Sequence, residues 1–583
     1  MHMLNGSPAD VKAAGSIWYN SVWFDLVIAV VAGFLYALLV MGQRPLNPRN
    51  VDWMSPDPAS YYIGWEMFRQ DPQVHWPLTY TDRLGYPKGE SVALLDINPL
   101  LALVLKSLSP LLPEPCQYFG IEVILACTLQ FFVAIRLFRL FLGSNLLGIA
   151  LCSVFFLLAP PFNLRFRAHY ALTNQWLLLA ALFVFAQAQQ RSSRSIQRFV
   201  FWAAALAAVS VSINPYLAFQ VVLILMTAVA SLRWQKRITL WQSAAIVGLL
   251  VAVGFVMSYS FGLIIRGGRG YGAAGYRYYS MNLLALFDPL DRGSVLRGRL
   301  PVADFGQYEG YNYLGAGVLL LATVVVVAAL IRRSKVWRPD RRWLVPLLLC
   351  CLLLTLLALS TKITLGARTL VDLDPHEALS PYFAALRSSG RLFWAPYHVI
   401  LAGTLAAPFL LFPRAWANLL IAGALVLQFA DTSALRHRVH TTIIEHHPSP
   451  LKSPIWSELG TLHQNLIVLP AWQCASGSTS PGGADGYRFF GFLAIQQKMR
   501  TNSYASGRYT EVAKDFHCSQ SVAALAQQPL SPDSAYVVTS ELAALIARGP
   551  TGPGKCHDLD NFILCSSKTD FGLSPVPTRP GGF

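Results

Sequence analysis

The sequence predicts a polytopic α-helical membrane protein with about eleven transmembrane helices, followed by an α/β domain outside the membrane. Hydrophobic residues make up 54% of the 583 residues and charged residues only 13%, whereas soluble proteins carry roughly a quarter charged residues. The mean hydropathy is positive, at +0.43, which excludes a disordered or ordinary cytosolic protein. A transmembrane helix needs roughly 17–25 apolar residues. Eleven runs approach or reach this length: 22–41, 117–135, 145–161, 172–189, 199–213, 215–232, 240–264, 314–331, 343–360, 391–412 and 415–431.

The first run favours a retained anchor, because no small-residue cleavage site follows it before Arg44. Basic residues in short loops set the orientation of the spans. With the N-terminal tail 1–21 inside, the inner loops hold one acid, Asp340, and fifteen basic residues: Arg136, Arg139, Arg191, Arg194, Arg198, Arg233, Lys236, Arg237, Arg332, Arg333, Lys335, Arg338, Arg341, Arg342 and Arg414. These loops account for +14 of the net charge of +16. The basic excess therefore indicates topology and not a nucleic-acid partner.

This orientation makes 22–432 the membrane region, with long outer loops at 42–116, 265–313 and 361–390. The apolar segment 97–112 is short and interrupted by Lys106 and Pro110. If it spanned the bilayer, every later basic loop would face outward, so we expect a surface-lying or partly inserted helix.

The tail 433–583 is long enough for a domain of its own. Strand-like runs at 466–469, 536–539 and 562–564 alternate with helical patterns, which predicts a small α/β domain. An odd number of spans places this domain outside the cytoplasm.

Four of the nine cysteines lie in this tail: Cys474, Cys518, Cys556 and Cys565. An even set in an oxidising compartment predicts two disulfides. Three pairings are possible. Cys556 and Cys565 bracket an expected hairpin, which favours that pair and leaves Cys474 with Cys518. A zinc site is the alternative, although no C-x-x-C pair is present.

The first outer loop carries two carboxylates, Asp52 and Asp57, just beyond the first span. A carboxylate at this level can bind a divalent cation or take a proton from an attacking hydroxyl. Alternatively, Asp57-Pro58 is a simple turn, and the neighbouring aromatic residues are interface anchors.

Two further segments carry cationic residues at the predicted outer boundary of the membrane. The rule that basic residues gather in inner loops does not account for them. The connection 163–174 carries Arg165, Arg167 and His169, and the loop before the tenth span carries Arg387 and Arg391. Guanidinium groups match phosphate oxygens in pairs, so these residues are candidates for holding a lipid-linked phosphate. The alternatives are contact with ordinary lipid headgroups and, in the second segment, capping of the following helix by Ser388 or Ser389.

The outer loop 265–313 contains a glycine-rich stretch, 267–272, and later Tyr308 and Glu309. The glycines lack a preceding strand and a following Lys-Ser/Thr, so they form no P-loop. A mobile loop over a cavity fits them better. Glu309 is a candidate contact to a sugar or a metal. The predicted spans hold few ionisable residues at mid-membrane depth, which argues against a proton-coupled pump.

This layout resembles the GT-C-type integral-membrane glycosyltransferases. The resemblance covers about residues 20–432 and is carried by Asp57 after the first span, the amphipathic stretch 98–112 and the outer arginine clusters. The segments 309–315 and 386–394 also look like those of a little-described bacterial group with this architecture. The first-loop pattern departs from the adjacent acidic pairs of several such families, so a divalent cation stays one option among others.

The resemblance implies an inverting transferase in a bacterial inner membrane, with its C-terminal domain in the periplasm. Its donor is a sugar on a polyprenyl phosphate, its acceptor a glycan or lipid, and no nucleic acid takes part. In that reading Asp57 is the general base, supported by Asp52. Tyr308 and Glu309 contact substrate, and the donor phosphate is held by Arg165, Arg167, His169, Arg387 and Arg391. The alternative is a non-catalytic membrane protein, either a lipid or glycan transporter or an assembly partner.

Overall fold

The structure is a computed structural model that describes residues 22–190, 195–264, 271–272, 275–332, 340–374, 386–474, 479–552 and 555–568. The expected inner tail 1–21 and residues 267–270 of the glycine-rich stretch lie outside the described residues, as does the part of the outer loop 361–390 between 375 and 385.

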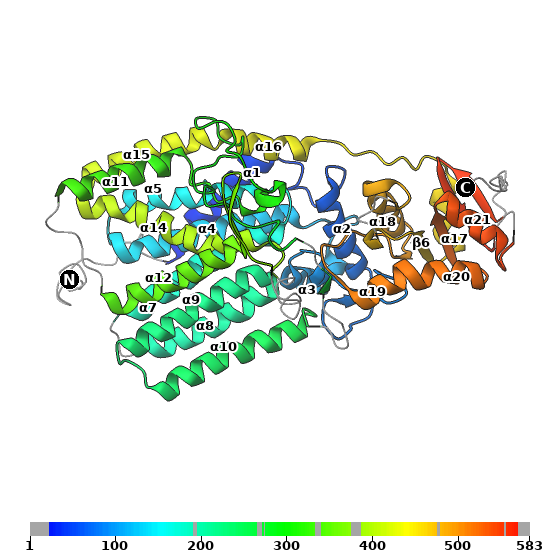
Figure 1. The fold of residues 1–583 in the computed structure, drawn as a ribbon, viewed down its shortest axis with the longest axis horizontal. Helices are drawn as coiled ribbons and strands as arrows, with labels where there is room; N and C mark the ends of the chain where they lie inside the picture. Colours follow the sequence, from blue (N-terminus) through cyan, green and yellow to red (C-terminus); the bar gives the residue numbers. More distant parts are fainter. Residues whose placement is uncertain are drawn as a thin grey trace.

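All eleven apolar runs contain helices, and these helices form one elongated bundle (Figure 1). They are α1 (Val22–Met41), α4 (Phe119–Leu142), α5 (Leu146–Leu157), α7 (Trp176–Gln189), α8 (Ser195–Ile213), α9 (Pro215–Trp234), α10 (Leu240–Ser260), α11 (Ala316–Arg332), α12 (Arg341–Leu359), α14 (Trp394–Leu411) and α15 (Arg414–Asp431). Within the described residues, nine helical segments are long and apolar enough to cross a membrane. The α5 helix and the apolar part of α11 are shorter.

Local sequence explains how several helices begin and pack. Asn145 and Asn214 cap α5 and α9, and Thr239 with Gln242 forms a capping box on α10. Gly33 lets α1 lie directly on α4, because a Cβ at this position would stand 2.5 Å from the Thr128 backbone nitrogen.

The first outer loop folds into α2 (Pro56–Arg69), a short β1–β2 pair (Tyr80–Thr81 and Glu90–Ser91) and α3 (Pro99–Ser107). The α3 helix has nine residues, far fewer than the roughly 20 that a span requires. It packs against α2 and α8, in agreement with a segment that does not span.

The α16 helix (Ser433–Ile444) connects the bundle to a C-terminal domain at the opposite end of the molecule (Figure 1). This domain contains one five-stranded sheet in the order β10-β11-β9-β6-β7. Its strands are β6 (Asn465–Leu469), β7 (Arg500–Thr501), β9 (Ser534–Val538), β10 (Cys556–Leu559) and β11 (Phe562–Cys565). The β6 strand runs parallel to β7 and β9, whereas β11 runs antiparallel to both β9 and β10. The helices of the domain include α17 (Ile455–Leu462), α18 (Gly486–Gln496), α20 (Ser521–Gln527) and α21 (Ser540–Arg548).

The tail cysteines are paired as the hairpin argument favours. Cys556 and Cys565 face each other across the β10–β11 register and are disulfide-bonded. Cys474 is bonded to Cys518. The free cysteines of the described residues all lie outside this domain.

The C-terminal domain is docked on the first outer loop. The α18 helix packs against α2, and the Tyr487 hydroxyl donates to the Pro56 carbonyl. Leu84 forms a parallel bridge with Thr501. This contact brings a segment of the C-terminal domain, residues 503–510, toward the outer end of the helical bundle.

Candidate functional site

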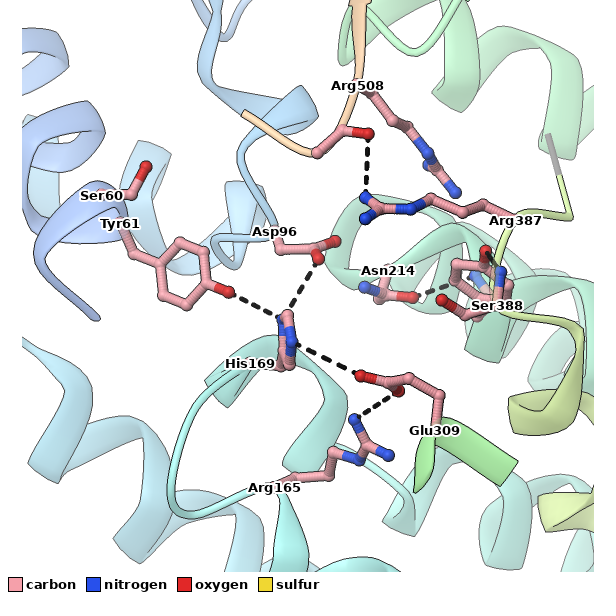
Figure 2. Close-up of polar contacts among 12 residues, drawn as sticks. Ser60, Tyr61, Asp96, Arg165, His169, Asn214, Glu309, Arg387, Ser388 and Arg508 are labelled. Carbon is pink, nitrogen blue, oxygen red and sulfur yellow. Dashed lines mark hydrogen bonds and ion pairs between the residues drawn. The ribbon is translucent and has the colours of Figure 1, made fainter. Parts of the chain in front are cut away.

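Polar side chains from separate parts of the chain meet at the end of the bundle that faces the C-terminal domain (Figure 2). They come from α2, from the loop before α3, from the connection after α6 (Pro160–Leu164), and from two 3-10 helices, η5 (Phe305–Gly310) and η7 (Ser389–Phe393). We call this group the outer polar cluster; its central members are Tyr61, Asp96, Arg165, His169, Glu309 and Arg391.

Glu309 lies at the centre of the cluster and is buried between two arginines. Its Oε2 accepts from Arg165 Nη1 at 2.9 Å and from Arg391 Nε at 2.9 Å. Burial alone would raise the pKa of Glu309, but Arg165 and Arg391 hold it well below its usual range. One carboxylate thus pairs with two buried guanidinium groups, and the three side chains together carry a net charge of +1.

His169 joins Glu309 to a second carboxylate, Asp96. Its Nδ1 lies 2.7 Å from the Tyr61 hydroxyl and 3.3 Å from Asp96 Oδ2, and its Nε2 lies 3.9 Å from Glu309 Oε1. Burial raises the pKa of Asp96, but the hydrogen bond and charge of His169, with Arg391 and Arg508, lower it below its ordinary value. His169 thus contacts Tyr61 and Asp96 directly through Nδ1, whereas Glu309 lies beyond hydrogen-bond distance of its Nε2.

Asp96 and His169 both have left-handed backbones, with φ of 58° and 63°. This conformation is uncommon outside glycine and costs of order 1–3 kcal/mol where it is strained. The surrounding fold therefore holds both backbones in this conformation, and with them the two side chains that meet.

Asp57 lies in the first turn of α2 and is exposed. Among the residues that the structure describes, its carboxylate has no hydrogen-bond partner. Its charge reaches the cluster: burial, Glu309, Tyr279 and Asp57 raise the pKa of Tyr308 to about 12. Burial followed by Asp57 also raises the pKa of Tyr61. Asp57 is thus an exposed carboxylate four residues before Tyr61 on the same helix, and Tyr61 is a member of the cluster.

Asp52 and Arg167 are placed differently from the other candidates. Asp52 pairs with Arg44 at 2.8 Å and lies 3.6 Å from His446, so its charge is taken by neighbours outside the cluster. Arg167 is exposed, and its charge acts on Arg292. In the described part of the chain, no hydrogen bond or ion pair joins either side chain to the cluster.

Arg387 lies at the edge of the cluster. Its Nη1 donates to the Gly507 carbonyl at 3.0 Å, and its guanidinium stands 5.2 Å from the Tyr279 ring centre. The capping expectation for this segment is wrong, because neither serine side chain caps η7. Ser388 offers its backbone N–H to the Tyr216 hydroxyl, and Ser389 donates to the Ala358 carbonyl instead.

Sequence reasoning missed Tyr61, Asp96 and Arg508. Tyr61 follows Asp57 by four residues, and this spacing on a helix puts both on one face, a signal that the sequence does contain. Asp96 directly precedes the apolar segment 97–112, with no motif around it. Its left-handed backbone depends on the folded loop. Arg508 lies in an unpatterned stretch of the tail, and nothing in the sequence indicates that this stretch returns to the membrane region.

The described residues contain no group of three or more His, Cys, Asp or Glu side chains arranged to hold a metal ion. The two carboxylates nearest to His169 are already engaged: Asp96 by His169 itself, and Glu309 by two arginines. The divalent cation considered from sequence therefore has no ready ligand set in this part of the chain.

The chain belongs to the family described as "Domain of unknown function (DUF6311)", which matches residues 30–433, and residues 455–567 match the "DUF6311 C-terminal domain". No curated protein matches the chain. Among solved structures, it is similar to the oligosaccharyltransferase of Archaeoglobus fulgidus tethered with an acceptor peptide, with a TM-score of 0.41 and 10% identity over 92% of this chain and 73% of that chain. The same enzyme in complex with Zn and sulfate gives a TM-score of 0.40 and 11% identity over 91% and 70%. Similarity at this level carries no argument about activity.

Proposed function

We propose that this protein is an inverting GT-C-type membrane glycosyltransferase. It transfers a sugar from a polyprenyl-phosphate donor to a glycan or lipid acceptor at the outer face of a bacterial inner membrane. The observation that carries the proposal is the outer polar cluster with Asp57 beside it. A reactive carboxylate, a net cationic group and a histidine–carboxylate pair gather at the end of an apolar helical bundle, where a lipid-linked substrate presents its polar head.

Asp57 is the proposed general base. It takes the proton of the acceptor hydroxyl as that oxygen bonds to the anomeric carbon of the sugar. The bond from the anomeric carbon to the phosphate oxygen breaks, and polyprenyl phosphate leaves with the electron pair. Attack from the face opposite the phosphate inverts the anomeric configuration. An exposed carboxylate with no partner among the described residues is suited to this task, since no ion pair has to break before it accepts a proton.

The cationic groups are proposed to stabilise the departing phosphate. Arg165 and Arg391 share the charge of Glu309, so their trio offers one net positive charge in a fixed position. Arg387 adds a second. His169 is held by Asp96 and Tyr61 and supplies a ring N–H to the same region. Tyr308, half-buried and next to Glu309, is the proposed sugar contact. Asp52 and Arg167 have no supporting contact to the cluster.

The proposal is tested with the purified full chain in lipid nanodiscs. Polyprenyl-phosphate donors carrying different single sugars are incubated with the protein and an extract of envelope glycans and lipids from a strain that lacks the gene. Mass spectrometry then measures release of free polyprenyl phosphate and the matching gain of one sugar on an acceptor. Both products are expected for at least one donor. Failure of every donor, with protein that is folded and monodisperse, contradicts the proposal and favours a non-catalytic role.

A further inference from the structure

The segment 503–510 of the C-terminal domain reaches back to the membrane region and is held there at several points. It leaves the sheet after β7 and ends in β8 (Tyr509–Thr510), which pairs with β3 (Tyr271–Gly272) of an outer loop. On the way, the Tyr504 hydroxyl donates to Glu90 Oε2 at 3.0 Å. The Ala505 carbonyl accepts from the Ser60 hydroxyl, and the Gly507 carbonyl accepts from Arg387 at 3.0 Å. The segment is therefore a fixed part of the site's surroundings and not a loose linker.

Arg508 on this segment projects beside the outer polar cluster. Figure 2 shows its side chain next to that of Arg387. Its guanidinium stands 5.3 Å from the ring centre of Tyr216, and Arg391 stands 5.3 Å from the centre of the same ring. Tyr216 thus serves as a platform for one cation from the membrane region and one from the C-terminal domain.

Arg508 has an acidic neighbour in the cluster, since its charge lowers the pKa of Asp96. The Arg387 contacts are a carbonyl and an aromatic ring, neither of which carries a negative charge. Its Nε is buried and has no hydrogen-bond partner among the described residues. A buried donor without a partner is costly, and an anion bound at Arg387, with Arg508 beside it, removes this cost. Planar guanidinium groups bind phosphate oxygens through paired hydrogen bonds.

We propose that Arg387 and Arg508 form a phosphate-binding site between the membrane region and the C-terminal domain. Its ligand is the phosphate of a polyprenyl-linked substrate. The inference rests on the proposed function, because it assigns the anionic group of the same substrate to specific residues. It adds a residue of the C-terminal domain to the site, so that the domain participates directly in binding the lipid-linked substrate.

The test measures binding and not transfer. The full chain in nanodiscs of neutral lipid is titrated with a polyprenyl monophosphate. The arms for comparison are the uncharged polyprenol, phosphatidylglycerol and inorganic phosphate. The variants are Arg387→Gln and Arg508→Gln, and Arg500→Gln is the matched control. Arg500 is an arginine of the same domain that packs on Tyr86, away from the cluster.

We expect Arg508→Gln and Arg387→Gln each to weaken binding of polyprenyl monophosphate about 10- to 100-fold, since a hydrogen bond to a charged group contributes about 1.5–3 kcal/mol. Arg500→Gln is expected to bind like the wild type. Equal affinity of the wild type and Arg508→Gln overturns the inference. If the wild type binds polyprenol as tightly as polyprenyl monophosphate, the site recognises the hydrocarbon chain, and the inference is overturned. If it binds phosphatidylglycerol as tightly, the site recognises any anionic headgroup, and the inference is likewise overturned.

A second measurement needs no variant and covers the case in which Arg508→Gln does not fold. Wild-type protein is labelled with phenylglyoxal, which modifies arginine, and the peptide containing Arg508 is quantified by mass spectrometry. Polyprenyl monophosphate is expected to slow labelling of Arg508 but not of Arg500, whereas polyprenol leaves both unchanged. Unaltered labelling of Arg508 overturns the inference. Binding through Arg508 without any sugar transfer contradicts the proposed function alone, while transfer with normal binding by Arg508→Gln contradicts this inference alone.

Discussion

Replacing Glu309 with glutamine removes the only charge that the structure places between Arg165 and Arg391 among the described residues. All three side chains are buried, with relative exposures of 3%, 5% and 6% for Arg165, Arg391 and Glu309. Removing one partner of a buried ion pair costs about 3–5 kcal/mol, because the remaining charge stays buried without compensation. Here Arg165 loses its ion-pair partner among the described residues, while Arg391 keeps only the charge of Asp96, with which it forms no described ion pair. We therefore expect Glu309→Gln to lower the free energy of unfolding by at least about 3 kcal/mol.

The matched control is Asp304→Asn in the same outer loop. Asp304 pairs with Lys362 at 2.8 Å, but both side chains are more than 20% exposed, and a pair of this kind contributes about 0.2–1 kcal/mol. Thermal unfolding in detergent, followed by the fraction of monodisperse protein after heating, compares the two variants. A melting temperature of Glu309→Gln equal to that of Asp304→Asn would refute the view that Glu309 is the electrostatic centre of the cluster. A role for Glu309 limited to substrate contact would then fit better.

Three further predictions concern other parts of the chain. Burial raises the pKa of Glu90 from 4.5 to about 7. Between these two pH values the folded state keeps the proton on Glu90, whereas the unfolded chain loses it. Stability is therefore expected to fall by about 3 kcal/mol as pH rises from below 4.5 through 7. Glu90→Gln should abolish that part of the pH dependence in thermal melts, and identical pH profiles would contradict the burial argument. Thiol counting on denatured, unreduced protein should find five free thiols among the nine cysteines, because four are bonded; nine would exclude both disulfides. Reporter fusions after Thr432 should be active only on the outer side of the membrane, and activity in the cytoplasm would overturn the predicted orientation.

Much of the helical architecture could be predicted because the bilayer imposes a simple rule on sequence. The run 22–41 forms α1, which ends at Met41 as predicted, since twenty apolar residues have few other stable arrangements. Strands of the tail could be located in the same way, and β6 extends the predicted 466–469 by one residue. The disulfide pairing followed from a hairpin whose ends meet by geometry.

The candidate site was only partly predictable, because its members meet through long-range contacts. Glu309 could be named as a polar candidate, but its position between Arg165 and Arg391 depends on two segments 144 and 82 residues away. The orientation of the Asp96 side chain depends on a left-handed backbone conformation that the local sequence does not predict. The position of Arg508 beside the cluster depends on how the C-terminal domain docks on the membrane region. Asp52 lies close to Asp57 in sequence but pairs with Arg44, so its role in supporting Asp57 stays a prediction.

The central claim is that the carboxylate of Asp57 acts on the substrate. Asp57→Asn keeps the size of the side chain and most of its hydrogen bonding but removes the charge, and Asp52→Asn is the matched control five residues away. Both variants are expressed in a strain that lacks the gene, and the yield of the modified glycan or lipid is measured by mass spectrometry at equal protein levels. A general base contributes about 10²–10⁴-fold in rate, so Asp57→Asn should lose at least about 100-fold in activity while Asp52→Asn retains most of it. Near-normal activity of folded Asp57→Asn would contradict the claim and make Asp96 the next candidate for the base.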